Sequence, residues 1–166
     1  ARQLHLPFQS GNDRVLKEMN RRYTRAQYLE LVNYAKSVMP DIVLTSDVII
    51  GFPGETEAEA MDTVSLVEEV GFDALFTVIY SPRPGTKAAA MPDPATKAEK
   101  QLWFDRLLAV QNAKSAQIHA GYIGKTLRVL VDGRSGDENY PLSSRTEGNR
   151  LVRLKGDESL MGQFVQ

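Results

Sequence analysis

Apolar and polar positions follow two different periods along the first 80 residues. Leu4, Leu6 and Phe8 alternate with polar neighbours, and β-branched residues fill 42–52, which predicts a strand in each segment. The run 74–80 predicts a third strand. Between these segments the apolar residues recur every three or four positions, so each strand is expected to be followed by helical structure.

Capping residues mark where these helices begin. Asn12 or Asp13 can cap a short helix, Thr24 precedes a longer one that ends at Pro40, and Thr56 with Glu59 forms a capping box. The third helix is expected to run from 57 to about 70 and to stop at Gly71. The apolar stripes expected to face the core are Leu29, Val32, Ala35 and Val38, then Met61, Val64, Val67 and Val70.

Three strands that are each followed by a helix indicate parallel βαβ units. Because right-handed crossovers bring the carboxyl ends of parallel strands to one edge, we expect three polar, Gly- or Pro-bearing loops to converge there, as at the mouth of a TIM-like barrel. These loops are Gln9–Ser10, 51–55 and 81–86. Convergence favours a ligand-binding role for 51–55, although an ordinary strand-to-helix loop also fits its Gly-rich sequence.

The character of the chain changes in its last quarter. After a linker over 87–95, Thr96 caps a long helix that reaches about residue 118 and carries Trp103 toward the core. Beyond Gly121 and Gly124, short strands over 127–131, 151–154 and 164–165 predict a small β-barrel, with turns at Asp132–Gly133 and 155–157. We therefore expect two domains, over 1–124 and 125–166.

Composition narrows the possible functions. The net charge is −1 over 166 residues, and no apolar run is long enough to suggest a membrane segment, so a cytoplasmic protein without a membrane partner is expected. Basic residues are enriched in 125–155, which fits either RNA contact or a solvated surface. Without cysteine and with only His5 and His119, no metal site is expected.

The sequence has no initiator Met, and both of its ends interrupt predicted strands. Ala1 leads directly into a strand, and the chain ends after Phe164 and Val165. We therefore expect a fragment of a longer polypeptide. Open strand edges also predict oligomerisation, strand exchange or cover by a flanking helix.

Several motifs in series resemble one family. They are His-Leu-Pro-Phe-Gln-Ser-Gly-Asn-Asp at 5–13, Arg-Arg-Tyr-Thr at 21–24, Ser-Asp-Val-Ile-Ile-Gly-Phe-Pro-Gly-Glu-Thr at 46–56, Tyr-Ser-Pro-Arg-Pro-Gly-Thr at 80–86 and Leu-Ser-Ser-Arg-Thr-Glu-Gly-Asn-Arg at 142–150. Together they resemble the radical S-adenosylmethionine methylthiotransferases, and the last resembles the start of that family's TRAM domain. The residues of this last motif favour the branch that makes 2-methylthio-N6-isopentenyladenosine in tRNA over the branch that modifies a ribosomal protein.

The resemblance implies an α/β fold, namely the second half of a radical SAM barrel followed by a truncated TRAM β-barrel. It also implies a transferase that adds a methylthio group to C2 of N6-isopentenyladenosine beside the anticodon, with S-adenosylmethionine and two 4Fe–4S clusters as cofactors and tRNA as partner. In the family, cysteines hold both clusters, and this chain has none. A fragment without them is expected to be inactive, to bind no cofactor and to leave catalysis to the parent protein.

The same resemblance assigns site residues. It places Asp47, Ile49 and Gly51 along the adenine of S-adenosylmethionine, with Glu55 one position later than the family's pattern. The remaining candidates are Gln9 and Ser10 for the ribose and methionine groups, Arg83 (and more weakly Arg22) for a carboxylate or phosphate, and Arg145, Asn149 and Arg150 for tRNA. Capping of the following helix is the plain structural alternative for Glu55.

Two other functions remain open from the sequence. One is an intact, non-catalytic α/β module that binds a nucleotide or RNA. The other is a different barrel enzyme that uses His5, Asp47 and Glu55 as acid–base groups, since all three lie near predicted strand ends.

Overall fold

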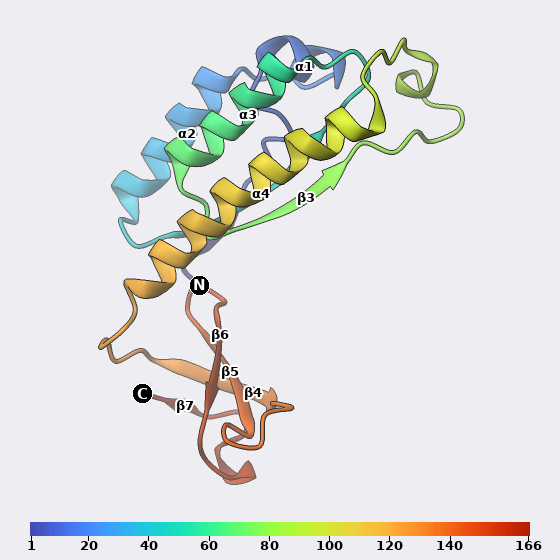
Figure 1. Ribbon diagram of the computed structural model, residues 1–166. Coiled ribbons are helices and arrows are strands. Elements are labelled where there is room, and N and C mark those ends of the chain that lie inside the picture. The colour runs from blue at the N-terminus through green and yellow to red at the C-terminus, as the bar shows by residue number, and fades with distance from the viewer.

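The computed structural model describes all residues from 1 to 166 and shows two units joined by one long helix (Figure 1). The first, here called the α/β unit, contains β1 (Gln3–His5), α1 (Asp13–Glu18), α2 (Arg25–Val38), β2 (Val43–Ile50), α3 (Glu57–Val70), β3 (Ala74–Ile79), a 3₁₀ turn (Ala88–Ala90) and α4 (Lys97–Ala120). The second, here called the β unit, contains β4 (Val129–Arg134), β5 (Leu142–Thr146), β6 (Leu151–Leu154), a 3₁₀ turn (Glu158–Leu160) and β7 (Phe164–Val165).

Each unit has its own sheet. In the α/β unit the strand order is β1-β2-β3 and both pairings are parallel, as the βαβ pattern predicted. In the β unit the order is β6-β5-β4-β7 and every pairing is antiparallel. The structure is therefore a mixed α/β arrangement with one parallel and one antiparallel sheet.

Local capping signals set the helix starts correctly. Asn12 caps α1, and full capping boxes begin α2 at Thr24, α3 at Thr56 and α4 at Thr96. Gly71 ends α3 in the left-handed region, at φ 67°. No helix of the structure combines the length and the apolar character that crossing a membrane requires.

Helices α2, α3 and α4 cover one face of the parallel sheet (Figure 1). Leu44, Val48 and Ile50 point from β2 into the core that these helices share, together with Trp103 and Leu107 of α4. Trp103 is thus a core residue, as predicted. The opposite face has no helix on it, and Phe76 and Val78 of β3 remain 66% and 53% exposed there.

Two predicted stripes are partly wrong. Val38, expected in the core, is 59% exposed at the end of α2, while Tyr28, which was not in the predicted stripe, is buried near the start of the helix. In α3 the buried positions include Ala60 and Leu66, whereas Met61 and Val64 are only half-buried. The face that a helix buries depends on its rotation against the sheet, which the apolar period alone leaves open.

The β unit differs from its prediction at two places. Asp132–Gly133 is not a turn, because β4 continues to Arg134 through a register shift between Val131 and Gly133. No strand was expected over 142–146, but this segment forms β5, the strand between β4 and β6. Polar Ser and Arg residues hide this strand, since its only strongly apolar residue is Leu142.

Candidate functional site

A tight loop connects β2 to α3 and is held by its own glutamate. After Ile50 the backbone of Gly51 takes a positive φ of 73°, and the chain returns to α3 through Gly54 at φ 76°. Glu55 turns back into this loop and accepts hydrogen bonds from the backbone N–H groups of Gly51 (2.5 Å) and Phe52 (3.1 Å). The carboxylate therefore fixes the loop from inside.

Burial dominates the electrostatics of Glu55. Only 2% of the residue is exposed, and this burial raises the pKa of its carboxyl to about 7, against the opposing effect of the two backbone N–H donors. The second oxygen, Oε1, has no hydrogen-bond partner. The group is therefore able to hold a proton at Oε1 near neutral pH.

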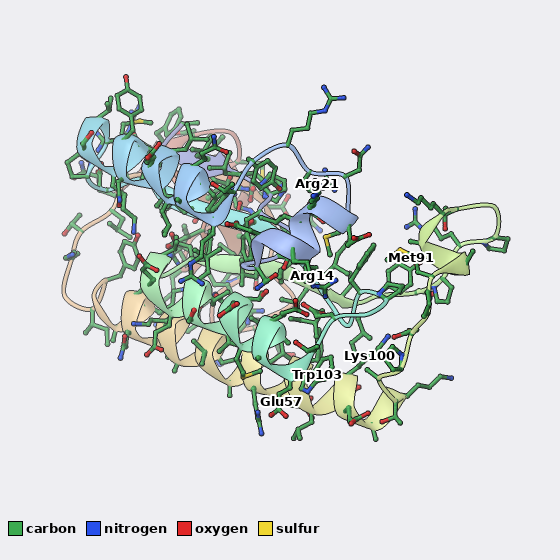
Figure 2. All side chains as sticks on the ribbon, turned by 90° about the horizontal axis from the view of Figure 1, so that it is seen from above. Arg14, Arg21, Glu57, Met91, Lys100 and Trp103 are labelled. Atoms are coloured by element: carbon green, nitrogen blue, oxygen red, sulfur yellow. The ribbon has the colours of Figure 1, made fainter.

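Two basic side chains clamp the same loop from outside, and neither was expected from the sequence. The stem of Lys100, on α4, lies against Gly51, and its Nζ donates to Asp93 at 2.5 Å. Arg14, on α1, donates to the carbonyl of Gly54 (2.8 Å) and to both oxygens of Glu59. Figure 2 shows Arg14 between α1 and α3, and Lys100 between α4 and the segment that carries Met91.

The loop after β1 lies beside the carboxyl end of β2. Gln9 has a positive φ of 65°, and its backbone donates to the carbonyl of Asp47 and accepts from Ile49. Ser10 is buried, with its Oγ 3.4 Å from Oγ1 of Thr63. The structure thus brings together four predicted site residues, Gln9, Ser10, Asp47 and Ile49. Gln9 contacts Asp47 and Ile49 through its backbone.

The uncovered face of the parallel sheet carries a small polar cluster. Asp47 and Ile49 are half-exposed on this face, in register with Phe76 and Val78. The ring of His5 lies 3.0 Å from Oγ1 of Thr45 through Nδ1 and 3.4 Å from Asp47 through Nε2. Glu55 is directed into the loop instead. The arrangement offers apolar wall and hydrogen-bonding groups side by side, which suits a ligand with a flat apolar ring and polar edges.

Arg83 is the predicted cofactor residue that the structure places apart. It lies on the exposed turn after β3, where its carbonyl accepts hydrogen bonds from Thr86. Phe52 and Tyr80 connect the base of that turn to the β2–α3 loop, with ring centroids 5.3 Å apart. The loops after β2 and β3 therefore meet at their bases.

The three predicted RNA-contact residues lie in or beside the β5–β6 turn and have different surroundings. Arg145 is 45% exposed and pairs with Asp132 at 3.3 Å. Asn149 is exposed, with φ 61°. Arg150, in contrast, is only 12% exposed and forms an ion pair with Asp73 of the α/β unit. The structure therefore separates Arg150 from the other two.

Other basic side chains of the β unit are also close to acidic partners or aromatic rings. Arg128 lies over the exposed ring of Phe164, 4.1 Å from its centroid, and Lys155 lies 5.8 Å from the centroid of Tyr140. Exposed rings next to cations are typical of surfaces on which nucleobases stack.

The donor set for metals is limited. No group of three or more His, Cys, Asp or Glu side chains is placed to hold a metal ion, and the chain has no cysteine. Thiolate ligands for an iron–sulfur cluster would have to come from outside these 166 residues.

Comparisons with known proteins agree with the motifs. Residues 1–67 match the model of the Radical SAM superfamily, and residues 121–166 match that of the TRAM domain. Proteins named tRNA-2-methylthio-N(6)-dimethylallyladenosine synthase are similar to the chain over nearly its whole length. The one from Thermoanaerobacter sp. (strain X514) is 48% identical over 162 residues, which are 98% of this chain and 34% of that protein.

Two further relatives with the same name give the same result. The protein from Syntrophotalea carbinolica is 48% identical over 99% of this chain and 38% of its own length. The protein from Clostridium perfringens (strain 13 / Type A) is 48% identical over 98% of this chain and 36% of its own length. The chain thus spans little more than a third of these relatives. The resemblance that its motifs indicated is confirmed.

Proposed function

We propose that this chain is the C-terminal part of a tRNA-modifying radical SAM methylthiotransferase. The observation that carries the proposal is the similarity to the tRNA-2-methylthio-N(6)-dimethylallyladenosine synthases over 98–99% of the chain. In this proposal residues 1–124 are the second half of a radical SAM barrel, and residues 125–166 are the start of a TRAM β-barrel. The parallel sheet with helices on one face and the four-stranded antiparallel sheet are compatible with these two assignments.

The proposed reaction places a methylthio group on C2 of N6-isopentenyladenosine beside the anticodon of tRNA. S-adenosylmethionine and two 4Fe–4S clusters would supply the radical chemistry, the sulfur and the methyl group. The residues present do not fit a cluster, because the chain offers no thiolate. They fit the adenine side of S-adenosylmethionine, because the apolar strand residue Ile49 lies next to the loop that begins at Gly51.

Each candidate residue has a specific proposed task. Ile49 gives apolar contact to the adenine, and the backbone carbonyl of Gly51 accepts a hydrogen bond from it, since the N–H of Gly51 already donates to Glu55. Asp47 lies on the same sheet face as Ile49 and offers a carboxylate that can accept a hydrogen bond. Glu55 holds the shape of the loop from inside. Gln9 and Ser10 border the ribose and methionine end, and Arg83 on its exposed turn meets a carboxylate or phosphate.

The β unit is proposed to contact the anticodon stem-loop. Arg145 and Asn149 are exposed and are assigned to phosphate positioning, which fixes the RNA without reading its sequence. The pairing of Arg145 with Asp132 has to be exchanged for phosphate on binding. Because exposed ion pairs contribute little, this exchange costs little.

Two measurements test the proposal. Disruption of the reading frame that encodes this chain should abolish 2-methylthio-N6-isopentenyladenosine in tRNA hydrolysates analysed by mass spectrometry, and should leave N6-isopentenyladenosine to accumulate. The chain itself should bind an anticodon stem-loop in fluorescence anisotropy, with an affinity that falls steeply with salt.

The opposite results would favour a non-catalytic nucleotide- or RNA-binding module. These results are stem-loop binding by the chain together with an unchanged level of the methylthio nucleoside after disruption. If the chain does not bind the stem-loop and disruption leaves the methylthio nucleoside unchanged, the tRNA assignment is removed altogether.

A further inference from the structure

The β5–β6 turn presents Arg150 to the α/β unit. Asn149, with φ 61°, reverses the chain, and its N–H donates to the carbonyl of Thr146 at 2.9 Å. The N–H of Arg150 donates to Oγ1 of the same threonine at 3.1 Å. These bonds fix the backbone from which the Arg150 side chain leaves the β unit.

Arg150 ends in a buried ion pair with the other unit. Its partner is Asp73, the residue before β3, and both side chains are 12% exposed. The guanidinium also lies over the ring of Tyr122, 5.0 Å from its centroid. Asp73 is itself fixed, because its Oδ2 accepts a hydrogen bond from the backbone of Leu44 on β2.

The neighbouring turn residues contact the same end of the parallel sheet. Gly148 lies so close to the side chain of Val43 that no Cβ would fit between them. The N–H of Arg2 donates to the carbonyl of Glu147 at 2.8 Å, and the carbonyl of Arg2 accepts from Val43 at 2.8 Å. The turn 147–150 is thus seated on the residues that begin β1, β2 and β3.

We propose that Arg150 and Asp73 are positioning residues that lock the β unit onto the amino ends of the parallel strands, and that Arg150 does not itself contact RNA. A phosphate contact would require the guanidinium to leave Asp73, and a buried carboxylate without its partner is strongly unfavourable. The docking part of this inference stands on contacts alone, and its RNA part rests on the proposed function.

The contact of Arg150 with Asp73, here called the lock, fixes where an RNA bound to the β unit would lie relative to the α/β unit. The candidate cofactor residues lie at the carboxyl end of β2, whereas the β unit is seated at its amino end (Figure 1). The eight residues of β2 span roughly 26 Å at about 3.3 Å per residue. An RNA that engages both places therefore has to extend along the α/β unit, and its register depends on a fixed β unit.

Small-angle X-ray scattering of the 166-residue chain tests the lock. The variants are Arg150→Met and Asp73→Asn, the exchange pair Asp73→Arg/Arg150→Asp, and Arg153→Met as a control whose partner, Asp137 at 3.6 Å, lies within the β unit. We expect a larger radius of gyration in both single variants, recovery in the exchange pair and no change in the control. Arg150→Gln, which removes the charge but keeps a polar side chain, replaces Arg150→Met if the latter does not fold.

Stem-loop binding at several salt concentrations tests the RNA part. Arg150→Met should weaken binding about tenfold, because a loose β unit must be ordered on binding, while the slope of log affinity against log salt stays that of the wild type. A slope reduced by about one phosphate contact would show direct RNA contact and overturn this part. Unchanged scattering in both single variants would overturn the lock, even if the wild type binds no stem-loop and the proposed function itself fails.

Discussion

The side chain of Lys100 occupies the place where a side chain on Gly51 would begin. A Cβ built on Gly51 would lie 2.6 Å from Cδ of Lys100, well inside van der Waals contact. The two residues are 49 positions apart in sequence, and their contact joins α4 to the loop that follows β2. Gly51 is thus required twice, for its positive φ and for the lysine stem packed against it.

Gly51→Ala should destabilise the chain more than Gly54→Ala. Both positions have positive φ, but a Cβ at Gly54 would meet only the carbonyl of Pro92 at an ordinary 3.7 Å. The difference in unfolding free energy should be about 1–3 kcal/mol, the cost of overpacking. Urea denaturation measures it, and adding Lys100→Ala to Gly51→Ala should recover part of the loss. Equal effects of both glycine variants would show that the lysine stem yields freely.

Glu55 should make stability fall as pH rises from about 4.5 to about 7. Its folded-state pKa is raised from 4.5 to about 7, so the folded protein binds the extra proton in this window and loses that advantage as the proton leaves. The effect should approach about 3 kcal/mol across the window. Glu55→Gln, which keeps an acceptor for both N–H groups, should flatten the dependence in urea titrations. A wild-type curve as flat as that of the variant would contradict the raised pKa.

Glu59 should act in the opposite sense at lower pH. The hydrogen bond from Arg14 comes first among the causes that lower the pKa of this carboxyl to about 2, so its stabilising effect is present above pH 4.5 and is lost as the pH falls toward 2. Because Arg14 is half-exposed, removing the pair should cost only about 1 kcal/mol. Glu59→Gln tests this in acid unfolding. Glu99→Gln is the matched control, since Glu99 has the same capping box with Thr96, and no arginine contributes to its lowered pKa.

Arg145→Ala should weaken stem-loop binding and lower its salt dependence by about one phosphate contact. Its side chain is 45% exposed on the β unit. Arg106, on α4, is equally exposed and also paired with an acid, so Arg106→Ala is the control and should leave the salt slope unchanged. Anisotropy titrations at three or more salt concentrations separate the two. If both variants lower the slope equally, binding is unspecific.

Phe76→Ser should reduce self-association of the chain. Phe76 and Val78 are exposed on the face of the parallel sheet that no helix covers, and β1 and β3 are open edges. Association of copies of the isolated chain is one of the three outcomes that the open strand edges predicted, beside strand exchange and cover by a flanking helix. Light scattering at rising concentration should show oligomers for the wild type and fewer for the variant. Leu102→Ser, at a 51% exposed position on α4, should change nothing.

Contacts encoded within a few residues were predictable from the sequence. The capping boxes at Thr24, Thr56 and Thr96 and the left-handed stop at Gly71 depend on neighbours no more than four positions away. The three parallel strands followed from apolar runs separated by helical periods. Strand β5 was not predicted because its residues, apart from Leu142, are Ser, Arg and Thr. Their pairing is decided by the strands on either side.

The sequence by itself determined the helix starts, the three parallel strands and the motifs that carry the family resemblance. Tertiary structure alone decided that Glu55 turns inward, that Lys100 packs on Gly51, and that Arg150 is largely buried in an ion pair with Asp73. The physical reason is the distance along the chain over which each kind of interaction acts. Capping and periodicity act between neighbours along the chain, whereas burial of a charge depends on which distant element packs against it. The sequence of an RNA-binding motif is therefore the same whether its arginine binds a phosphate or pairs with a buried aspartate.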